Sequence, residues 1–117
     1  MRLLLLPLFI ALAGFAASAQ AVSELPTGKY EARFKSGNTR WEKGDIVIVN
    51  DKEYKLSGGE TGEYRISVAA QRVFFVSGPL KSAYAKLSTA NGKPVITFPT
   101  DQNRDLGITD EVIAKKE

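Results

Sequence analysis

Apolar and polar residues alternate in short bursts along most of the chain from Leu25 onwards. A period of two is typical of a β-strand with one face in a core, whereas an amphipathic helix repeats every 3.6 residues. The bursts cover residues 29–35, 45–49, 53–57, 63–68, 72–77, 83–88, 94–98 and, with the weakest pattern, 108–114. Short turns separate them. We therefore expect an all-β fold, a single up-and-down antiparallel meander of seven or eight strands forming a small barrel or half-open sandwich.

The segment 56–64, LSGGETGEY, places three glycines between two apolar stretches. A phosphate-binding loop would need a lysine and a hydroxyl on a following helix, whereas a strand follows here. Pairing Leu56 with Tyr64 and Tyr54 with Ile66 would put like faces together, so we interpret the segment as the bend of a hairpin with a loop of three or five residues.

Two other hairpins differ in how well their pairing can be predicted. Asn91-Gly92 is a typical two-residue turn and places Leu87 opposite Ile96. In the 45–49 burst the four residues 46–49 are all apolar, so either alternate pair could face the core.

The adjacent residues Phe74 and Phe75 must send one ring to each face of their strand. The pattern leaves open which ring faces the core. The outward ring is either covered by a loop or terminal segment or forms a docking patch that could include Tyr84 and Trp41.

Arg40 and Trp41 lie in the glycine-containing segment SGNTRWEKG. Arginine and tryptophan often dominate the energetics of binding interfaces, so this pair is a candidate contact site. A tryptophan that plugs one end of the barrel is the alternative that we favour, because a small β domain has few large side chains to close its core.

Asp101, Asn103 and Asp105 are spaced like the first three oxygen ligands of a calcium loop. The rest of the motif is missing, because Leu106 occupies the position where the loop requires glycine and no flanking helices are expected. We therefore expect no metal site, and keep these three residues only as a calcium alternative.

Met1-Arg2 precedes an apolar run over residues 3–15 and the small-residue motif Ala17-Ser18-Ala19. This order is typical of a secretory signal peptide, and the run is too short for a membrane anchor. We expect residues 1–19 to be a signal peptide and residues 20–117 a single β domain without a membrane span, located in the periplasm or secreted.

The amino-acid composition argues against several classes of function. The chain has no histidine and no cysteine, which removes the usual general base, thiol nucleophile and zinc ligands, so we expect neither an enzyme nor a cofactor. The formal net charge is only +3, and basic residues form no stripe, which argues against a nucleic-acid partner.

The segments TGKY, GDIVIVNDKEYKLSGG, GEYRI and VFFVSGPL resemble small exported bacterial all-β proteins of unassigned function. Gly28-Lys29-Tyr30 is also similar to the G-x-W opening of lipocalin-like barrels, with tyrosine in place of tryptophan. These resemblances imply a β meander and no particular activity.

Together these features predict a noncatalytic binding module that acts on an unknown protein or cell-envelope partner. The candidate contact residues are Arg40, Trp41, Phe74 and Tyr84. The alternative is a small lipocalin-like barrel that binds an apolar small molecule.

Overall fold

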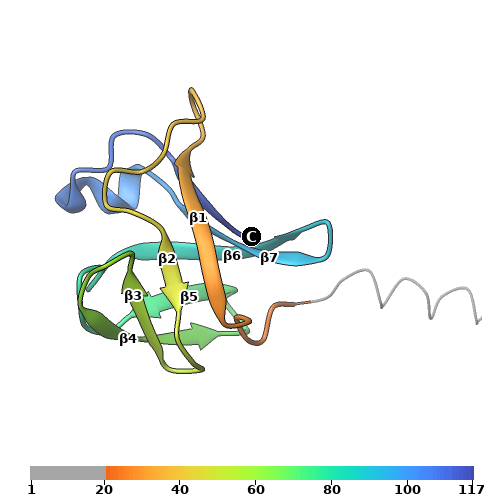
Figure 1. Cartoon of the computed structure of the whole chain (residues 1–117). Helices are drawn as coiled ribbons and strands as arrows, with labels where there is room; N and C mark the ends of the chain where they lie inside the picture. Colours follow the sequence, from red (N-terminus) through yellow and green to blue (C-terminus); the bar gives the residue numbers. More distant parts are fainter. Residues whose placement is uncertain (1–20) are drawn as a thin grey trace, which may run out of the picture.

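The computed structural model describes residues 21–117, and their strands form one closed antiparallel barrel (Figure 1). Each strand pairs with its neighbours in the chain, and β1 pairs with β8 to close the sheet. The strands are β1 (Gly28–Phe34), β2 (Ile46–Ile48), β3 (Glu53–Leu56), β4 (Thr61–Ser67), β5 (Arg72–Phe75), β6 (Tyr84–Ala90), β7 (Lys93–Phe98) and β8 (Val112–Lys116). The predicted all-β meander is confirmed, with eight strands and full closure. The predicted signal peptide lies outside the described residues.

The interior of the barrel is filled by aromatic and branched side chains. Trp41 packs on Phe98 with ring centroids 5.3 Å apart, and Phe75 lies between Phe98 at 5.8 Å and Tyr54 at 4.8 Å. Tyr54 and Phe98 are completely buried. An eight-stranded barrel is just wide enough for its own side chains to fill it, and this one is a packed core.

The β6–β7 hairpin has the predicted register, with Leu87 opposite Ile96, and both residues of its Asn91-Gly92 turn have positive φ. In β2 the question left open by the sequence is decided by pairing. Ile46 lies opposite Leu56, so the isoleucines of β2 face the core, while Val49 beyond the strand is 43% exposed.

The predicted pairing of Leu56 with Tyr64 is wrong. β3 instead pairs with β4 through Glu53 opposite Glu63, Tyr54 opposite Gly62 and Lys55 opposite Thr61. The slip is an even number of residues, so every side chain keeps its predicted face. The loop between the last paired residues has five residues, 56–60, one of the two expected lengths.

The close packing around Gly62 accounts for this register of β3 and β4. A Cβ at this position would collide with the carbonyl oxygen of Ser77 and would come within 2.8 Å of both the Gly78 Cα and the Tyr54 ring. The ring of Tyr54 therefore occupies the space that a side chain on Gly62 would need. Its hydroxyl donates to the Ser77 carbonyl at 2.8 Å and accepts from the Leu80 N–H at 2.8 Å. This glycine of the GGETG cluster thus belongs to the packing rather than to the bend.

The C-terminal region differs from the prediction. The last strand begins at Val112, four residues later than expected, because its partners β1 and β7 end opposite it at Phe34 and Phe98. Residues 101–106 form a short 3₁₀ helix, η2 (Asp101–Leu106). Gly107 ends this helix with a left-handed φ of 74°. In Figure 1 η2 is the short blue helix beside the barrel. It lies next to the start of β6, where Asn103 bonds to Tyr84.

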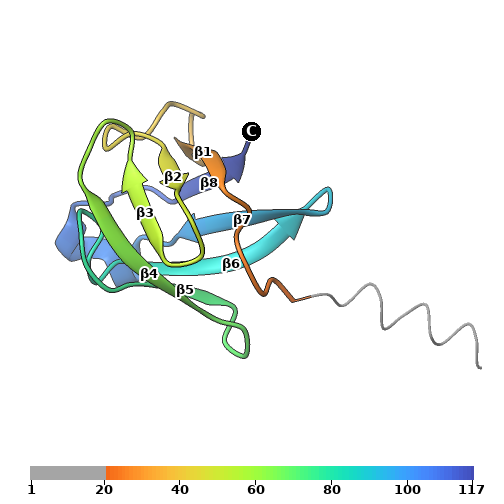
Figure 2. The same ribbon diagram turned by 60° about the horizontal axis from the view of Figure 1, so that its bottom comes forward.

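The segment ahead of β1 covers one end of the barrel (Figure 2). Val22 and Leu25 are buried in the core cluster. Gln71, at the turn between β4 and β5, accepts from the Val22 N–H at 2.9 Å and donates to the Val22 carbonyl at 3.0 Å. Residues 21–27 are therefore held in place by both apolar packing and hydrogen bonds.

Candidate functional site

Phe74 and Tyr84, two of the sequence candidates, lie opposite each other on the outer face of the barrel. The β5–β6 register pairs them directly, and Phe75 next in the chain is buried in the core. Phe74 is 40% exposed, so no loop or terminal segment covers its ring completely. The sequence had left open which phenylalanine points outward, and the strand pairing answers that question.

Arg72 connects the two rings. Its guanidinium carbon lies 4.4 Å from the centroid of the Phe74 ring and 3.8 Å from that of Tyr84. Both distances are within the range of cation–π contact. The two contacts hold the Arg72 guanidinium beside both rings, so it is positioned before any partner binds.

Two more cations flank this stack. Arg65 on β4 lies opposite Phe74, and Lys86 on β6 lies opposite Arg72. The five residues come from three adjacent strands and share one face. We call them the β4–β6 patch: Arg65, Arg72, Phe74, Tyr84 and Lys86. The exposed side chain of Val76 extends it toward the end of β5.

Trp41 does not belong to a surface. It is 3% exposed and packs on Phe98, as expected for the tryptophan that plugs the barrel. Arg40 next to it is exposed, but its guanidinium is used within the protein. It contacts Glu31 at 2.9 Å and Asp45 at 3.3 Å.

Asp45 is a buried carboxylate that organises this second region of the surface. It accepts from the Ala32 N–H at 3.2 Å and lies 3.8 Å from the Lys29 ammonium. β1 is four strands away from β5 in either direction around the barrel, so this region and the β4–β6 patch lie on opposite sides. The structure therefore brings Phe74 and Tyr84 together and leaves Arg40 and Trp41 apart from them.

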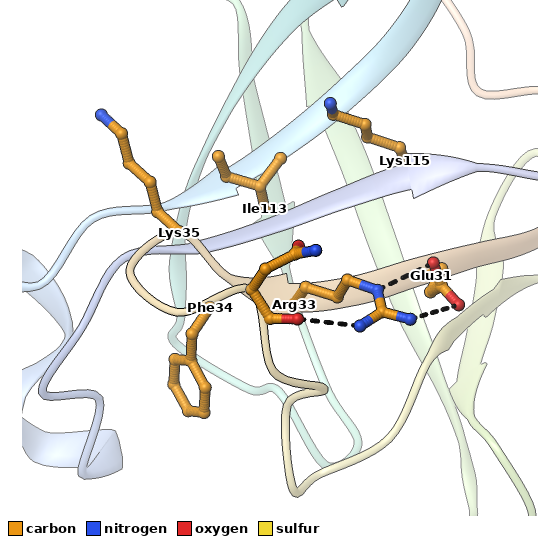
Figure 3. Close-up of a pocket in the computed structure, with 7 residues that line it drawn as sticks. Glu31, Arg33, Phe34, Lys35, Ile113 and Lys115 are labelled. Atoms are coloured by element: carbon orange, nitrogen blue, oxygen red, sulfur yellow. Dashed lines mark hydrogen bonds and ion pairs between the residues drawn. The ribbon is translucent and has the colours of Figure 1, made fainter.

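A hollow of about 530 Å³ lies on the outer surface of β1 and β8. Figure 3 shows the side chains that line it. Arg33 lies along its floor and donates to Glu31 at 3.0 Å and to the Asn38 carbonyl at 2.8 Å. The hydrogen bond from Arg33 lowers the pKa of Glu31 and raises that of Arg33. Lys35 at the rim pairs with Glu111 at 3.4 Å. Arg33 and Lys35 are thus matched by carboxylates of the same chain, and Lys115 is the one cation of this lining without such a contact among residues 21–117.

The calcium alternative does not fit the geometry of η2. Asn103, the middle residue of the proposed ligand set, is 1% exposed and its amide bonds inward. It accepts from the Tyr84 N–H at 2.8 Å and donates to the Tyr84 and Pro99 carbonyls at 2.9 Å and 2.6 Å. Asp101 instead lies 3.7 Å from Arg104. Over residues 21–117, no group of three or more acidic residues is placed to hold a metal ion.

Arg72, Arg65 and Lys86 were not among the contact residues predicted from the sequence. Arg72 was visible as the residue two places before Phe74, hence on the same face of its strand. Its contact with Tyr84, however, depends on the pairing of β5 with β6. The sequence showed that one ring of the Phe74-Phe75 pair must point outward, but not which one, nor that a cation contacts it and Tyr84.

Comparison with protein-family models, with curated protein sequences and with solved structures finds no significant match to this chain. In the described part of the chain, no helix has the length and apolar character needed to cross a membrane. Any functional proposal rests on the surface chemistry of the barrel itself.

Proposed function

We propose that this protein is a noncatalytic binding module that engages a protein or cell-envelope partner through the β4–β6 patch. The observation that carries the proposal is the stack of Phe74, Arg72 and Tyr84 on the outer face. Aromatic and arginine side chains are enriched among the residues that dominate binding energies. Here they are held in a fixed arrangement by adjacent strands, which lowers the entropy lost on binding.

The packed interior favours this proposal over a lipocalin-like barrel. A barrel that carries an apolar small molecule needs an internal cavity lined by apolar side chains. In this protein the inward residues pack against one another across the barrel, with ring centroids 4.8 to 5.8 Å apart. The exposed rings of the outer face are then the better candidates for a contact.

The proposal includes export. A partner in the cell envelope would meet this protein after removal of residues 1–19, which the sequence predicts. Mass spectrometry of the protein recovered from periplasm or culture medium should find a chain that begins at Gln20 or Ala21. Recovery of the uncut chain as the stable form would contradict export by this route.

A capture experiment tests the binding role. The protein with an affinity tag after Glu117 is used to retain partners from an envelope extract of the producing cell. We expect saturable capture by the wild type, its loss in Phe74→Ser, and its retention in Val49→Ser. Val49 is the matched control, because it is similarly exposed at 43% but lies beyond β2 on another side of the barrel.

Thermal unfolding of both variants must first show that they fold as the wild type does. Equal capture by the wild type and Phe74→Ser would exclude the β4–β6 patch as the contact surface. No saturable capture by any of the three proteins would count against a binding module as such.

A further inference from the structure

We infer that the β4–β6 patch binds an acidic segment of a partner protein, with partner carboxylates seated on Arg72, Arg65 and Lys86. This inference rests on the proposed function and adds the chemistry of the partner. It follows from the charges of the patch, from their lack of ion pairs within the chain, and from the aromatic rings beside them.

The cations of the patch are unpaired, whereas four cations on the opposite side of the barrel have partners. Lys29, Arg33, Lys35 and Arg40 each contact a carboxylate of the same chain within 4 Å. Among residues 21–117 no such contact involves Arg65, Arg72 or Lys86, which leaves three cations together on adjacent strands.

The register makes this arrangement unfavourable for the isolated barrel. Arg72 and Lys86 lie directly opposite each other on β5 and β6, and like charges at opposed positions destabilise a sheet. The Nε of Arg72 is also buried without a hydrogen-bond partner. A pair of carboxylates placed above the patch would remove the repulsion, and the flat guanidinium can donate two parallel hydrogen bonds to a carboxylate.

The same features argue against other occupants. A second copy of the chain would bring the same cations face to face across a two-fold axis, which is repulsive. Insertion into a membrane requires an apolar surface, whereas here the Arg72 guanidinium lies over both rings and Arg65 and Lys86 flank them. An extended acidic segment instead can place carboxylates on the cations and apolar side chains on the rings.

Acidic residues of the same chain lie at two edges of the β4–β6 patch. Glu63 on β4 lies next to Val76, whose N–H donates to the Glu63 carbonyl at 2.8 Å. At the other margin η2, with Asp101 and Asp105, is tied to the backbone of Tyr84 through Asn103. These acidic margins would repel a partner segment that runs beyond the patch, so they limit the contact to the central strands.

The probe for the test is a decaglutamate peptide, with decaglutamine as its neutral match. Titration of the protein, isotopically labelled and purified from the producing cell, is followed by NMR of the backbone amides. We expect saturable shifts confined to β4, β5 and β6, and none with decaglutamine. Affinity should fall by at least about tenfold when salt is raised from about 50 mM to about 300 mM, because the contact is largely electrostatic.

Substitutions locate the contact. We expect Arg72→Gln to weaken decaglutamate binding by about tenfold or more, as for the loss of a charge-assisted contact. Arg104→Gln, on the exposed side of η2, is the matched control and should bind as the wild type does. Where Arg72→Gln proves unfolded, Lys86→Gln takes its place, because the Lys86 side chain is exposed and outside the core.

Several results would overturn the inference. These are shifts centred on the β1–β8 hollow, equal binding of decaglutamine, an unchanged affinity in Lys86→Gln, or no binding of decaglutamate. Binding of phosphatidylglycerol vesicles or of a decathymidylate strand in place of decaglutamate would also overturn it and would assign the patch to lipid or nucleic acid. Phe74-dependent capture of a partner that neither salt nor decaglutamate displaces would leave the binding function standing and remove only the acidic partner.

Discussion

At the scale of single residues, the tyrosine hydroxyls connect the packed interior to the backbone at its ends. Tyr30 donates to the Pro26 carbonyl and Tyr64 to the Asn50 carbonyl, each at 2.8 Å. Tyr54 does the same for Ser77. A buried tyrosine is tolerated in a core when its hydroxyl reaches a partner, and each of these three bonds also holds a loop against the barrel.

Gly62 is the residue whose replacement tests this packing most directly. Gly62→Ala should destabilise the fold by about 1–3 kcal/mol, because its methyl group would overpack against Tyr54 and Gly78. Urea unfolding measures the change. Gly59→Ala in the same hairpin is the control, since its Cβ would meet no atom nearer than 3.4 Å, and it should change stability by less than about 0.5 kcal/mol. Equal effects of the two substitutions would contradict the contact across β3 and β4.

At the scale of elements, Asn103 attaches η2 to β6. Its amide makes one accepted and two donated hydrogen bonds to backbone groups of Tyr84 and Pro99. A short 3₁₀ helix has little stability of its own, so these bonds and the packing of Leu106 and Ile108 hold it in place. The same attachment fixes the backbone at Tyr84, where the β4–β6 patch begins.

Asn103→Ala should therefore destabilise the protein by at least about 2 kcal/mol, since it leaves buried backbone groups without partners. Gln102→Ala, at an exposed position of the same helix, should change stability by less than about 0.5 kcal/mol. Thermal unfolding compares the two. A hydrogen-exchange measurement should also find faster exchange of the Tyr84 amide in Asn103→Ala, and unchanged exchange there would refute the attachment.

Across the whole molecule, the closed barrel buries three tyrosines, Tyr30, Tyr54 and Tyr64, in one hydrophobic core. Burial raises the pKa of Tyr30 to about 12, with Tyr64 contributing a smaller electrostatic effect, and burial also raises the pKa values of Tyr54 and Tyr64. The folded state thus binds these phenolic protons more tightly than the unfolded state does. The stability linked to them is fully present below pH 10.0, the ordinary tyrosine pKa, and is lost as pH rises toward about 12.

The free energy of unfolding should accordingly decrease above pH 10.0, by about 2 kcal/mol from Tyr30 alone once pH reaches its folded pKa. Urea unfolding at a series of alkaline pH values measures this, with tyrosinate absorbance as a parallel probe. Tyr30→Phe should show a smaller decrease. A stability that stays constant up to pH 12 would contradict the burial of these hydroxyls.

Local sequence patterns were enough to predict which side chains of each strand face the core and where the tight turns lie. The two-residue period identified strands and assigned Tyr54, Leu56, Tyr64, Leu87 and Ile96 to the core, where all are buried. Asn91-Gly92 determined a hairpin and its register, because two consecutive residues with positive φ allow one turn geometry. Both are local properties, since backbone sterics and side-chain direction depend only on neighbouring residues.

The choice among strand registers that keep the same side chains in the core depends instead on the three-dimensional packing. Face alternation restricts the register to steps of two residues, so Leu56 with Tyr64 and Tyr54 with Gly62 satisfy it equally well. The choice follows from the space beside Gly62, which Ser77 and Gly78 close from a distant part of the chain. The Phe74–Arg72–Tyr84 stack has the same origin, because it forms only when β5 and β6 are aligned. Contacts between strands leave no trace in the apolar–polar pattern of one strand, so the sequence pattern does not reveal them.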